Sequence, residues 1–376
     1  MIKERVLYFK LKNCLISLYR SVGVKYIRDR FYMVNEIRRV FSTLNMPGKF
    51  SEEKSQWQRL FEGMAKDVMG SRKHIVKLLH GFAKEPLTLV KKASTINDFS
   101  APIVVCTQKN NIVYLREFIP YYRKLGVKHF VFIDNNSTDE SINFLKKQTD
   151  VTLFAAPYSF NGIKKAGWKL QALSFVGLNH WFLWLDSDEF LVYRGMEEIN
   201  LCEYIKRMNE KKIINVGGFM LDMYPEYQLF NNEMSVDDFY KDYKFFDPDS
   251  EHYRLVSGGL FGGMRGRCLG LYNLRLDKTP LVYCCENNIP SGNHTTSPRR
   301  KHLEDNYGCV LKHYKFLPNE KEKYRAIAKS DSGYASTESL KKYLDLTNVK
   351  IKDSKSVKYV DSNSISVFPF VKDFFS

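Results

Sequence analysis

The sequence lacks a long apolar run, lacks any Cys-x-x-C pair and has too few acidic residues to balance its bases. A bilayer-spanning helix needs about 20 mostly apolar residues, and no stretch approaches that length, so we expect no transmembrane helix. Lys10 and Lys12 interrupt the apolar part of the first 20 residues and no small-residue cleavage site follows, which argues against a secretory signal. The seven cysteines are odd in number and lack zinc-ligand spacing, which predicts reduced thiols in a cytoplasmic protein.

The positive charge is concentrated near the start of the chain. The net charge is +16 over 376 residues, and residues 1–98 hold 20 Lys and Arg against 9 Asp and Glu. Such an excess favours polyanions, namely an anionic membrane surface, nucleic acid or a phosphorylated acceptor. Apolar residues at helical spacing predict that residues 1–98 are mainly helical. Two interpretations stay open for this region: a helical domain with a solvated basic face, or a surface that docks on a membrane or partner.

From Ile103 onward, short apolar runs alternate with helical patterns. The pattern predicts strands at Ile103–Cys106, Val127–Ile133, Val151–Phe154, His180–Leu185 and Val216–Leu221, and helices from Ile112 to Gly126, at Ser141–Gln148 and at Gly167–Gly177. Pro120 is expected to kink or shorten the first of these helices. Alternation of this kind indicates an α/β fold, with a mostly parallel sheet covered by helices on both faces.

The most informative stretch is Trp184–Leu191, WLDSDEFL, in which an apolar run stops at Asp186, Asp188 and Glu189. The preceding strand would leave the core at the carboxyl end of the sheet, where open α/β folds bind ligands. Two carboxylates two residues apart could converge on Mg²⁺ or Mn²⁺, and such an ion could also bind a diphosphate. The alternative is a polar turn after a strand, with an Asp as a local cap.

Polar residues also follow the other predicted strands. Thr107 and Asn110 come after the first strand, and Asp134 follows the second, where it could accept hydrogen bonds from a base or ribose. Lys169, with Lys164 and Lys165, precedes the central strand and could meet phosphate charge, although lysines there could equally form a solvated helix face.

Three stretches together carry a family resemblance. VCTQKNNIVYLREFIPYYRKLGVKHFVFIDNNSTDES, WFLWLDSDEFL and VLKHYKFL resemble, in order and spacing, the family 2 glycosyltransferases of bacteria over about residues 100–325. The resemblance implies a GT-A (Rossmann-like) fold, a nucleotide-sugar donor and a divalent cation. It makes Asp134 a contact of the donor nucleoside, with Thr107 and Asn110 lining the same pocket.

The resemblance also suggests roles at the reacting end. It makes Asp186 and Asp188 the DxD pair, with Asp188 as the direct metal ligand. It also makes His313 the residue that completes the metal site. The alternative is a structural role for His313, which is usual for a lone His at the end of an apolar run. Lys315 could neutralise the leaving diphosphate. Two roles stay open for Glu189: it could support the loop or face the acceptor.

Two further sets of residues are candidates after the metal loop. An inverting transferase needs a general base, and Asp222 is the first candidate and Glu226 the second, although Asp222 also fits a turn before Pro225. Arg265, in the glycine-rich SGGLFGGMRGR, could clamp phosphate or an anionic acceptor, or the stretch could be a flexible loop.

The resulting hypothesis is a metal-dependent, inverting glycosyltransferase. It would transfer a sugar from a nucleotide-diphosphate sugar, expected to be a UDP-sugar, to a saccharide or glycolipid in bacterial surface-polysaccharide or lipopolysaccharide assembly. It divides the chain into a basic helical region (1–98), a GT-A domain (99–325) and a C-terminal helical segment with a tail (326–376). We expect a cytoplasmic protein, with peripheral contact at the inner face of the cytoplasmic membrane and no nucleic-acid partner.

Two other hypotheses remain. One is a polyanion or nucleic-acid binding protein that uses the basic N-terminal region, and the other is a catalytically silent nucleotide-sugar-binding scaffold. The aromatic end of the chain, VFPFVKDFF, could dock on the domain, on another subunit or on a membrane interface.

Overall fold

The computed structural model describes residues 32–66, 72–94, 100–230, 239–248, 252–256, 259–292, 294–297, 307–329, 342–344 and 349–371. The prediction that the first 20 residues form no secretory signal lies outside the described residues. Within the described ranges, no helix is both long enough and apolar enough to cross a bilayer.

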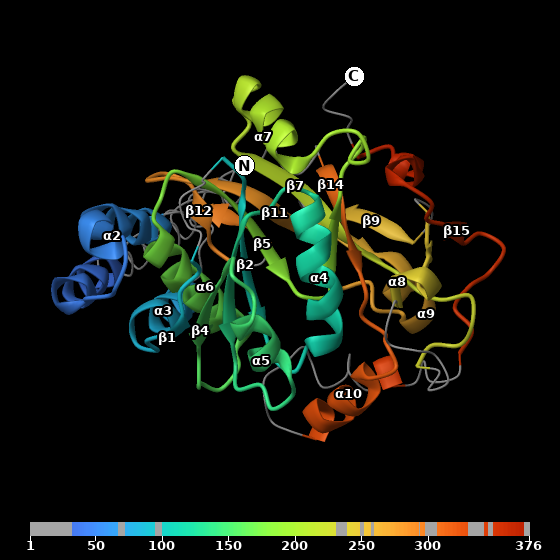
Figure 1. The fold of residues 1–376 in the computed structure, drawn as a ribbon, viewed down its shortest axis with the longest axis horizontal. Coiled ribbons are helices and arrows are strands. Elements are labelled where there is room, and N and C mark those ends of the chain that lie inside the picture. Colours follow the sequence, from blue (N-terminus) through green and yellow to red (C-terminus); the bar gives the residue numbers. More distant parts are fainter. Residues whose placement is uncertain are drawn as a thin grey trace, which may run out of the picture.

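A large central sheet organises the fold (Figure 1). Its strand order is β1-β4-β3-β2-β5-β11-β7-β14-β6. The strands are β1 (Thr88–Lys91), β2 (Ile103–Gln108), β3 (His129–Asp134), β4 (Val151–Ala155), β5 (His180–Asp186), β6 (Glu189–Val192), β7 (Asn215–Asp222), β11 (Asp277–Cys284) and β14 (Tyr307–His313). The strands predicted from apolar runs are therefore confirmed, and so is the α/β class.

The prediction of a mostly parallel sheet holds for one part of the sheet only. β4, β3, β2 and β5 are parallel to one another. β11 is antiparallel to both β5 and β7, β6 is antiparallel to β14, and β1 is antiparallel to β4, whereas β7 and β14 are parallel. The sheet is mixed because β11 returns between two strands that run the other way. The sequence interpretation predicted neither β11 nor its direction.

Helices cover both faces of the sheet. They are α4 (Ile112–Lys124), α5 (Ser141–Lys146), α6 (Gly162–Val176) and α7 (Leu201–Glu210). Leu183 and Leu185 of β5 pack in the core with α4 and α7, whereas Phe182 and Trp184 pack in the core with α6. Alternate side chains of a strand point to opposite faces, so β5 is buried on both.

Two helices differ from their predicted extent. α4 continues through Pro120 to Lys124, so the proline does not cut it short. α6 begins at Gly162, five residues before the predicted start, because the Asn161 side chain accepts hydrogen bonds from the Ile163 and Lys164 amides. The longer helix includes Lys164 and Lys165.

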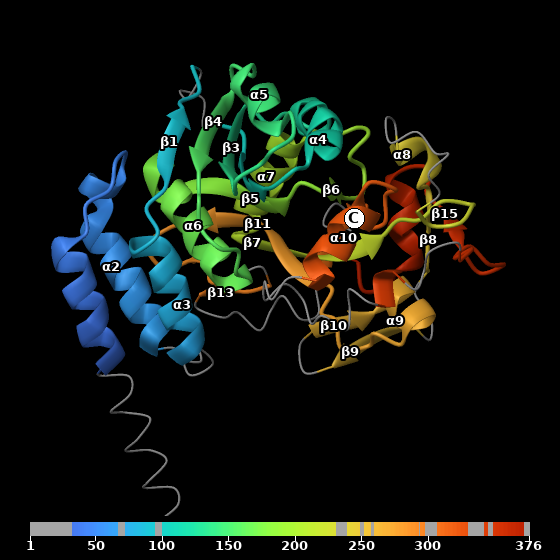
Figure 2. The ribbon, with the colours of Figure 1, turned by 90° about the horizontal axis from the view of Figure 1, so that it is seen from below.

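The N-terminal region contributes to both the sheet and its cover. Its elements are a helix over residues 32–43, α2 (Phe50–Lys66), α3 (Arg72–Ala83) and the strand β1, which the prediction of a mainly helical region missed. β1 pairs with β4 at one edge of the sheet. Figure 2 shows α2 and α3 lying beside α6 at this end of the molecule.

α3 and α6 cross at unusually short range. A Cβ atom added to Gly81 would lie 2.3 Å from the Lys164 carbonyl oxygen, and one added to Gly167 would lie 2.4 Å from the Leu78 carbonyl oxygen. Just after α3, Glu85 accepts a hydrogen bond from the Trp168 indole at 2.7 Å and pairs with Lys164. The two helices therefore pack backbone against backbone.

The described part of the C-terminal region docks on the domain. β15 (Val357–Lys358) pairs with β8 (Phe245–Phe246), and a 3₁₀ helix spans Ser362–Val367. The Phe368 ring lies 5.1 Å from that of Phe219 on β7. Of the three partners considered for VFPFVKDFF, the domain itself is therefore the one that residues 367–371 contact.

Candidate functional site

The carboxyl ends of several strands meet in one place. Thr107 at the end of β2 is the register partner of Asp186 at the end of β5. On the other side, His313 at the end of β14 is the partner of Asp222 on β7 and of Glu189 on β6. The turn of Ser187 and Asp188 joins β5 to β6, so the acid run predicted as the centre of the site connects the two groups of strands.

Asp186 is surrounded by lysines. Its carboxylate lies 2.9 Å from Lys165 Nζ, 3.3 Å from Lys169 Nζ and 3.4 Å from Lys278 Nζ. Lys165 and Lys169 lie one turn apart on α6, and Lys278 is the second residue of β11. The Asp186 side chain is 23% exposed, whereas all three lysine side chains are less than 10% exposed. Burial opposes ionisation of Asp186, but the three cations hold its pKa well below its usual range.

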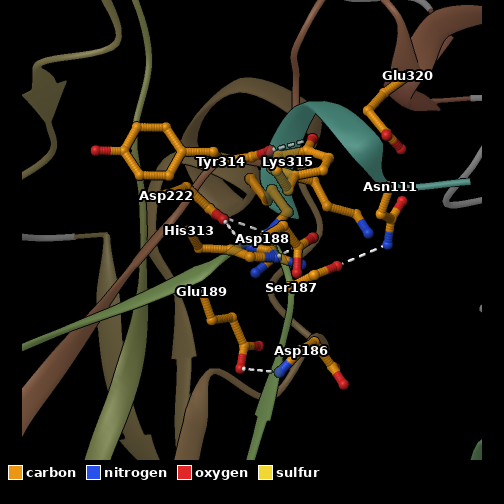
Figure 3. A network of polar contacts seen from close by, with 12 residues as sticks. Asn111, Asp186, Ser187, Asp188, Glu189, Asp222, His313, Tyr314, Lys315 and Glu320 are labelled. Atoms are coloured by element: carbon orange, nitrogen blue, oxygen red, sulfur yellow. Dashed lines mark hydrogen bonds and ion pairs between the residues drawn. The ribbon is translucent and has the colours of Figure 1, made fainter. Parts of the chain in front are cut away.

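Glu189 is buried and satisfied. It forms an ion pair with Lys278 and accepts a hydrogen bond from the Asp186 backbone amide at 3.1 Å, as Figure 3 shows for the backbone contact. These contacts are those of a residue that supports the loop, the first of the two roles left open for it.

Asp188 faces a different set of partners (Figure 3). Its Oδ2 lies 3.3 Å from His313 Nε2, and His313 Nδ1 lies 2.7 Å from Asp222 Oδ1. The second oxygen of Asp222 accepts a hydrogen bond of 2.7 Å from Arg265 Nε. Asp188, His313, Asp222 and Arg265 thus form a continuous line from the turn to α9 (Gly263–Leu269).

Charge along this line shifts the pKa values of its members. Burial would lower the pKa of His313, but the Asp188 and Asp222 carboxylates raise it above its ordinary value. Burial would raise the pKa of Asp222, but Arg265 and then His313 hold it below its ordinary value. Asp188 also has a lowered pKa, because His313 and Lys315 oppose the effect of its burial.

Among the residues that the structure describes, Asp188, Glu189 and His313 form a group of possible metal ligands, and each offers an atom within 4.8 Å of the others. If His313 donates its Nδ1 proton to Asp222, Nε2 is available as a ligand, the arrangement in which a carboxylate orients a metal-binding imidazole. Carboxylate oxygens suit Mg²⁺ or Mn²⁺, whereas an imidazole ligand suits transition-metal ions. The residues therefore fit a divalent cation at Asp188 and His313. Asp186, expected to assist there, instead contacts the lysines.

The residues expected at the nucleoside end lie on the neighbouring strands. Asp134 is buried and accepts hydrogen bonds from Gln108 and from the Ser137 amide. Asn110 has a left-handed backbone, and its side-chain oxygen accepts a 2.7 Å hydrogen bond from the Thr138 amide, so it shapes the loop.

Thr107 Oγ1 is buried and has no hydrogen-bond partner among the described residues. A buried hydroxyl without a partner costs free energy, so a ligand that bonds to it would be stabilising.

Three residues that the sequence interpretation did not assign also join the site. Asn111 donates a 2.7 Å hydrogen bond to Ser187 Oγ, and Lys323 of α10 (Glu320–Lys329) donates to the Asn111 side chain at 3.0 Å. Tyr343 lies 3.4 Å from Arg265 Nη1. The Asn-rich loop was a signal for Asn111, but the neighbouring Asn110 was predicted as the site residue of that loop. Lys323 and Tyr343 lie in segments that showed no motif.

The remaining predicted residues lie at the edges of this arrangement. Lys315 follows β14, and its ammonium group lies 5.4 Å from the centre of the Tyr324 ring. Glu226 pairs with Lys352 at 3.1 Å, and its side chain is 48% exposed. Arg265 is buried against Asp222, and its Nη2 has no hydrogen-bond partner among the described residues.

Fold and site together define an α/β protein with a mixed sheet that gathers carboxylates, a histidine and lysines at its strand ends. A stretch of 108 residues is 27% identical to a glycosyltransferase family 92 protein of Ricinus communis. It covers 28% of this chain and 19% of that protein. No protein-family model matches the chain, so membership of family 2 stays a prediction.

Proposed function

We propose that this chain is a metal-dependent glycosyltransferase of GT-A type that transfers a sugar from a UDP-sugar to a saccharide or glycolipid acceptor, with inversion at the anomeric carbon. The line from Asp188 through His313 to Asp222 carries the proposal, because it offers an oriented ligand pair for a divalent cation beside the acid turn. The family 92 relative supports the reaction class. Inversion and a role in bacterial surface-polysaccharide assembly rest on the family 2 resemblance.

Asp188 and His313 would hold Mg²⁺ or Mn²⁺. The bound cation would stabilise negative charge on the departing nucleoside diphosphate. Lys315 would add positive charge beside Asp188, whose pKa it helps to lower. Asp134 and Thr107 would bind the nucleoside, where Thr107 Oγ1 has no partner among the described residues.

The contacts of Asp222 favour a different role from the one that the sequence suggested. Both of its oxygens are occupied, one by His313 and the other by Arg265, and the side chain is 2% exposed. We therefore assign it the positioning of His313 instead of proton transfer. Glu226 remains the candidate for the base, because its carboxylate follows β7 and reaches solvent.

The proposed place of action is the cytoplasm. The basic residues of the N-terminal region would contact the inner face of the cytoplasmic membrane, where anionic lipids attract Lys and Arg.

Isothermal titration with UDP, with and without Mn²⁺, tests the proposal. We expect Mn²⁺ to raise the affinity for UDP. In the presence of Mn²⁺, Asp188→Ala should bind UDP at least ~100-fold more weakly than the wild type, because the substitution deletes a direct ligand. Asp353→Ala is the matched control, since Asp353 is a carboxylate held by Arg267 away from the acid turn. Transfer or hydrolysis of UDP-sugars should be lost in parallel with the Mn²⁺ effect.

Other outcomes would favour the other hypotheses. Absence of UDP binding under both conditions would refute the transferase, and salt-sensitive DNA binding in its place would support a nucleic-acid binding protein. UDP binding without turnover in any acceptor or hydrolysis assay would support the silent scaffold.

A further inference from the structure

Among the described residues, the strand that follows the acid turn has a strand neighbour on one side only. β6 is the last strand in the order of the sheet, and it pairs with β14 on its inner side. On the outer side, the Tyr122 hydroxyl of α4 donates to the Glu189 carbonyl oxygen at 3.0 Å and accepts from the Leu191 amide at 2.9 Å. Tyr122 is fully buried, so its side chain satisfies backbone groups that a further strand would otherwise pair. The backbone directly after Asp188 is therefore held by α4.

A second tyrosine of α4 holds the backbone beside the other proposed metal ligand. Tyr114 donates a 2.7 Å hydrogen bond to the carbonyl oxygen of Tyr314, the residue after His313. The Tyr314 amide donates in turn to the Asp188 carbonyl oxygen at 3.0 Å. Tyr114 and Tyr314 are each buried, so loss of the hydroxyl would leave a buried carbonyl group unsatisfied. The main chains at Asp188 and His313 are thus tied to each other and to α4.

These backbone contacts bear on the distance between the two proposed ligands. Asp188 Oδ2 lies 3.3 Å from His313 Nε2, and ligands must keep a close geometry to share one ion. Asp222 orients the His313 ring through Nδ1, but it does not determine where the main chain places that ring relative to Asp188. The tyrosine hydroxyls supply this second constraint, because each acts on the residue that follows a ligand.

We propose that Tyr114 and Tyr122 are positioning residues of the metal site, which set the separation of Asp188 and His313 through the main chain. The proposal rests on the metal site of the function proposed above and extends it to α4, a helix that supplies none of the proposed ligands. The two hydroxyl groups act through the ligands and do not contact the ion. Their removal should therefore lower the affinity for the metal ion before any nucleotide is bound.

The experiment measures Mn²⁺ affinity of the full chain without nucleotide, from the electron paramagnetic resonance signal of the free ion. Tyr114→Phe and Tyr122→Phe each remove one hydroxyl and keep the aromatic ring. We expect each variant to bind Mn²⁺ ~10-fold more weakly than the wild type, at the lower end of the about 10–100-fold loss that follows removal of an outer hydrogen-bond partner of a metal site.

Tyr193→Phe is the matched control. Tyr193 is also buried and donates a 2.6 Å hydrogen bond to a backbone carbonyl oxygen, that of Ile199, which lies just before α7. The substitution therefore removes the same kind of bond away from the metal site. All three variants should lose stability in urea unfolding, because each leaves a buried carbonyl group without its donor. Only the two α4 variants should lose Mn²⁺ affinity.

A second test uses the His313→Ala background, in which a general loss of structure and a positioning role give different results. If Tyr114 acts through His313, Tyr114→Phe should weaken Mn²⁺ binding by less than ~2-fold once the imidazole is absent, since residues that act through one another are not additive. If the substitution only loosened the fold, it would cause the same fold loss in both backgrounds.

The results separate this proposal from the proposed function. Mn²⁺ affinity equal to that of the wild type in both Tyr114→Phe and Tyr122→Phe would overturn the positioning role and leave the transferase intact. An equal loss of Mn²⁺ affinity in Tyr193→Phe, or an undiminished loss in the His313→Ala background, would do the same. Failure of the wild type to bind Mn²⁺ would overturn the proposed metal site as well.

Discussion

Two sides of the acid turn differ in how they hold a carboxylate. On the lysine side, defined by Lys165, Lys169, Lys278, Asp186 and Glu189, one partly exposed carboxylate is shared among three ammonium groups. On the histidine side, defined by Asp188, His313, Asp222 and Arg265, partners follow one another in a directional line. Two aspartates that are two residues apart therefore have different electrostatic environments, and the partners determine the role of each.

The difference arises from the strands that the turn connects. Asp186 ends β5 and faces α6, whereas Glu189 begins β6, which pairs with β14. Asp188 lies in the turn and contacts the end of β14. Directional partners suit a metal ligand that needs a fixed geometry, and a lysine cluster suits an anion that needs only charge.

Removal of Asp222 should have the largest effect on the histidine side. Asp222→Ala would leave the buried Arg265 guanidinium without its carboxylate, and loss of one partner of a buried ion pair costs about 3–5 kcal/mol. Urea unfolding measures this free energy. Glu226→Ala, which removes an exposed ion pair with Lys352, is the control and should cost less than about 1 kcal/mol. Equal losses in the two variants would contradict the buried pair.

A smaller effect is expected from a substitution in α6, the helix that carries Lys165 and Lys169. Gly167→Ala would place a Cβ atom 2.4 Å from the Leu78 carbonyl oxygen, and such overpacking costs about 1–3 kcal/mol. Gly63→Ala in α2 has no atom within 4 Å of the new Cβ and should stabilise the chain by about 0.5–1 kcal/mol. The same sign of change in both variants would argue against the close crossing.

The smallest effect is expected from removal of the hydrogen bond between Asn111 and Ser187, which holds the turn between the two sides. Asn111→Ala removes the 2.7 Å hydrogen bond to Ser187, which lies between the two aspartates, and should cost about 0.5–1.5 kcal/mol. UDP affinity in Mn²⁺ should fall less than about 10-fold. Asn143→Ala, which removes an exposed hydrogen bond to Glu140, should change neither stability nor binding measurably. A loss as large as that of Asp188→Ala would mean that Asn111 contacts the substrate itself.

The sequence predicted five of the nine strands of the sheet, namely β2, β3, β4, β5 and β7, but not β1, β6, β11 or β14. Apolar runs are local signals, and the acids that end β3 and β5 follow such runs directly. The meeting of Asp134, Asp186 and His313 at one edge also followed from strand alternation together with the family resemblance. These predictions depend on periodicity and on motifs, which can be read from a single chain.

The partners of these acids could not be predicted in the same way. The contact of Lys278 with Glu189 joins residues 89 positions apart, and that of His313 with Asp222 joins residues 91 apart. Such pairs depend on the direction of β11 and the register of β14, and neither is encoded in a local pattern. For this reason Asp222 could be proposed as a base although both of its oxygens are occupied.

The junction of β1 and α3 with the rest of the molecule has a consequence for fragment design. The family resemblance begins at about residue 100, but β1 pairs with β4, and Phe82 of α3 is buried in the same core as Trp184. A fragment that begins near residue 99 would leave β4 as an unprotected edge strand, which can pair with another chain. It would also expose apolar surface of α6, which promotes association. The unit that sequence similarity outlines is therefore smaller than the unit to be expressed for crystallisation or binding studies.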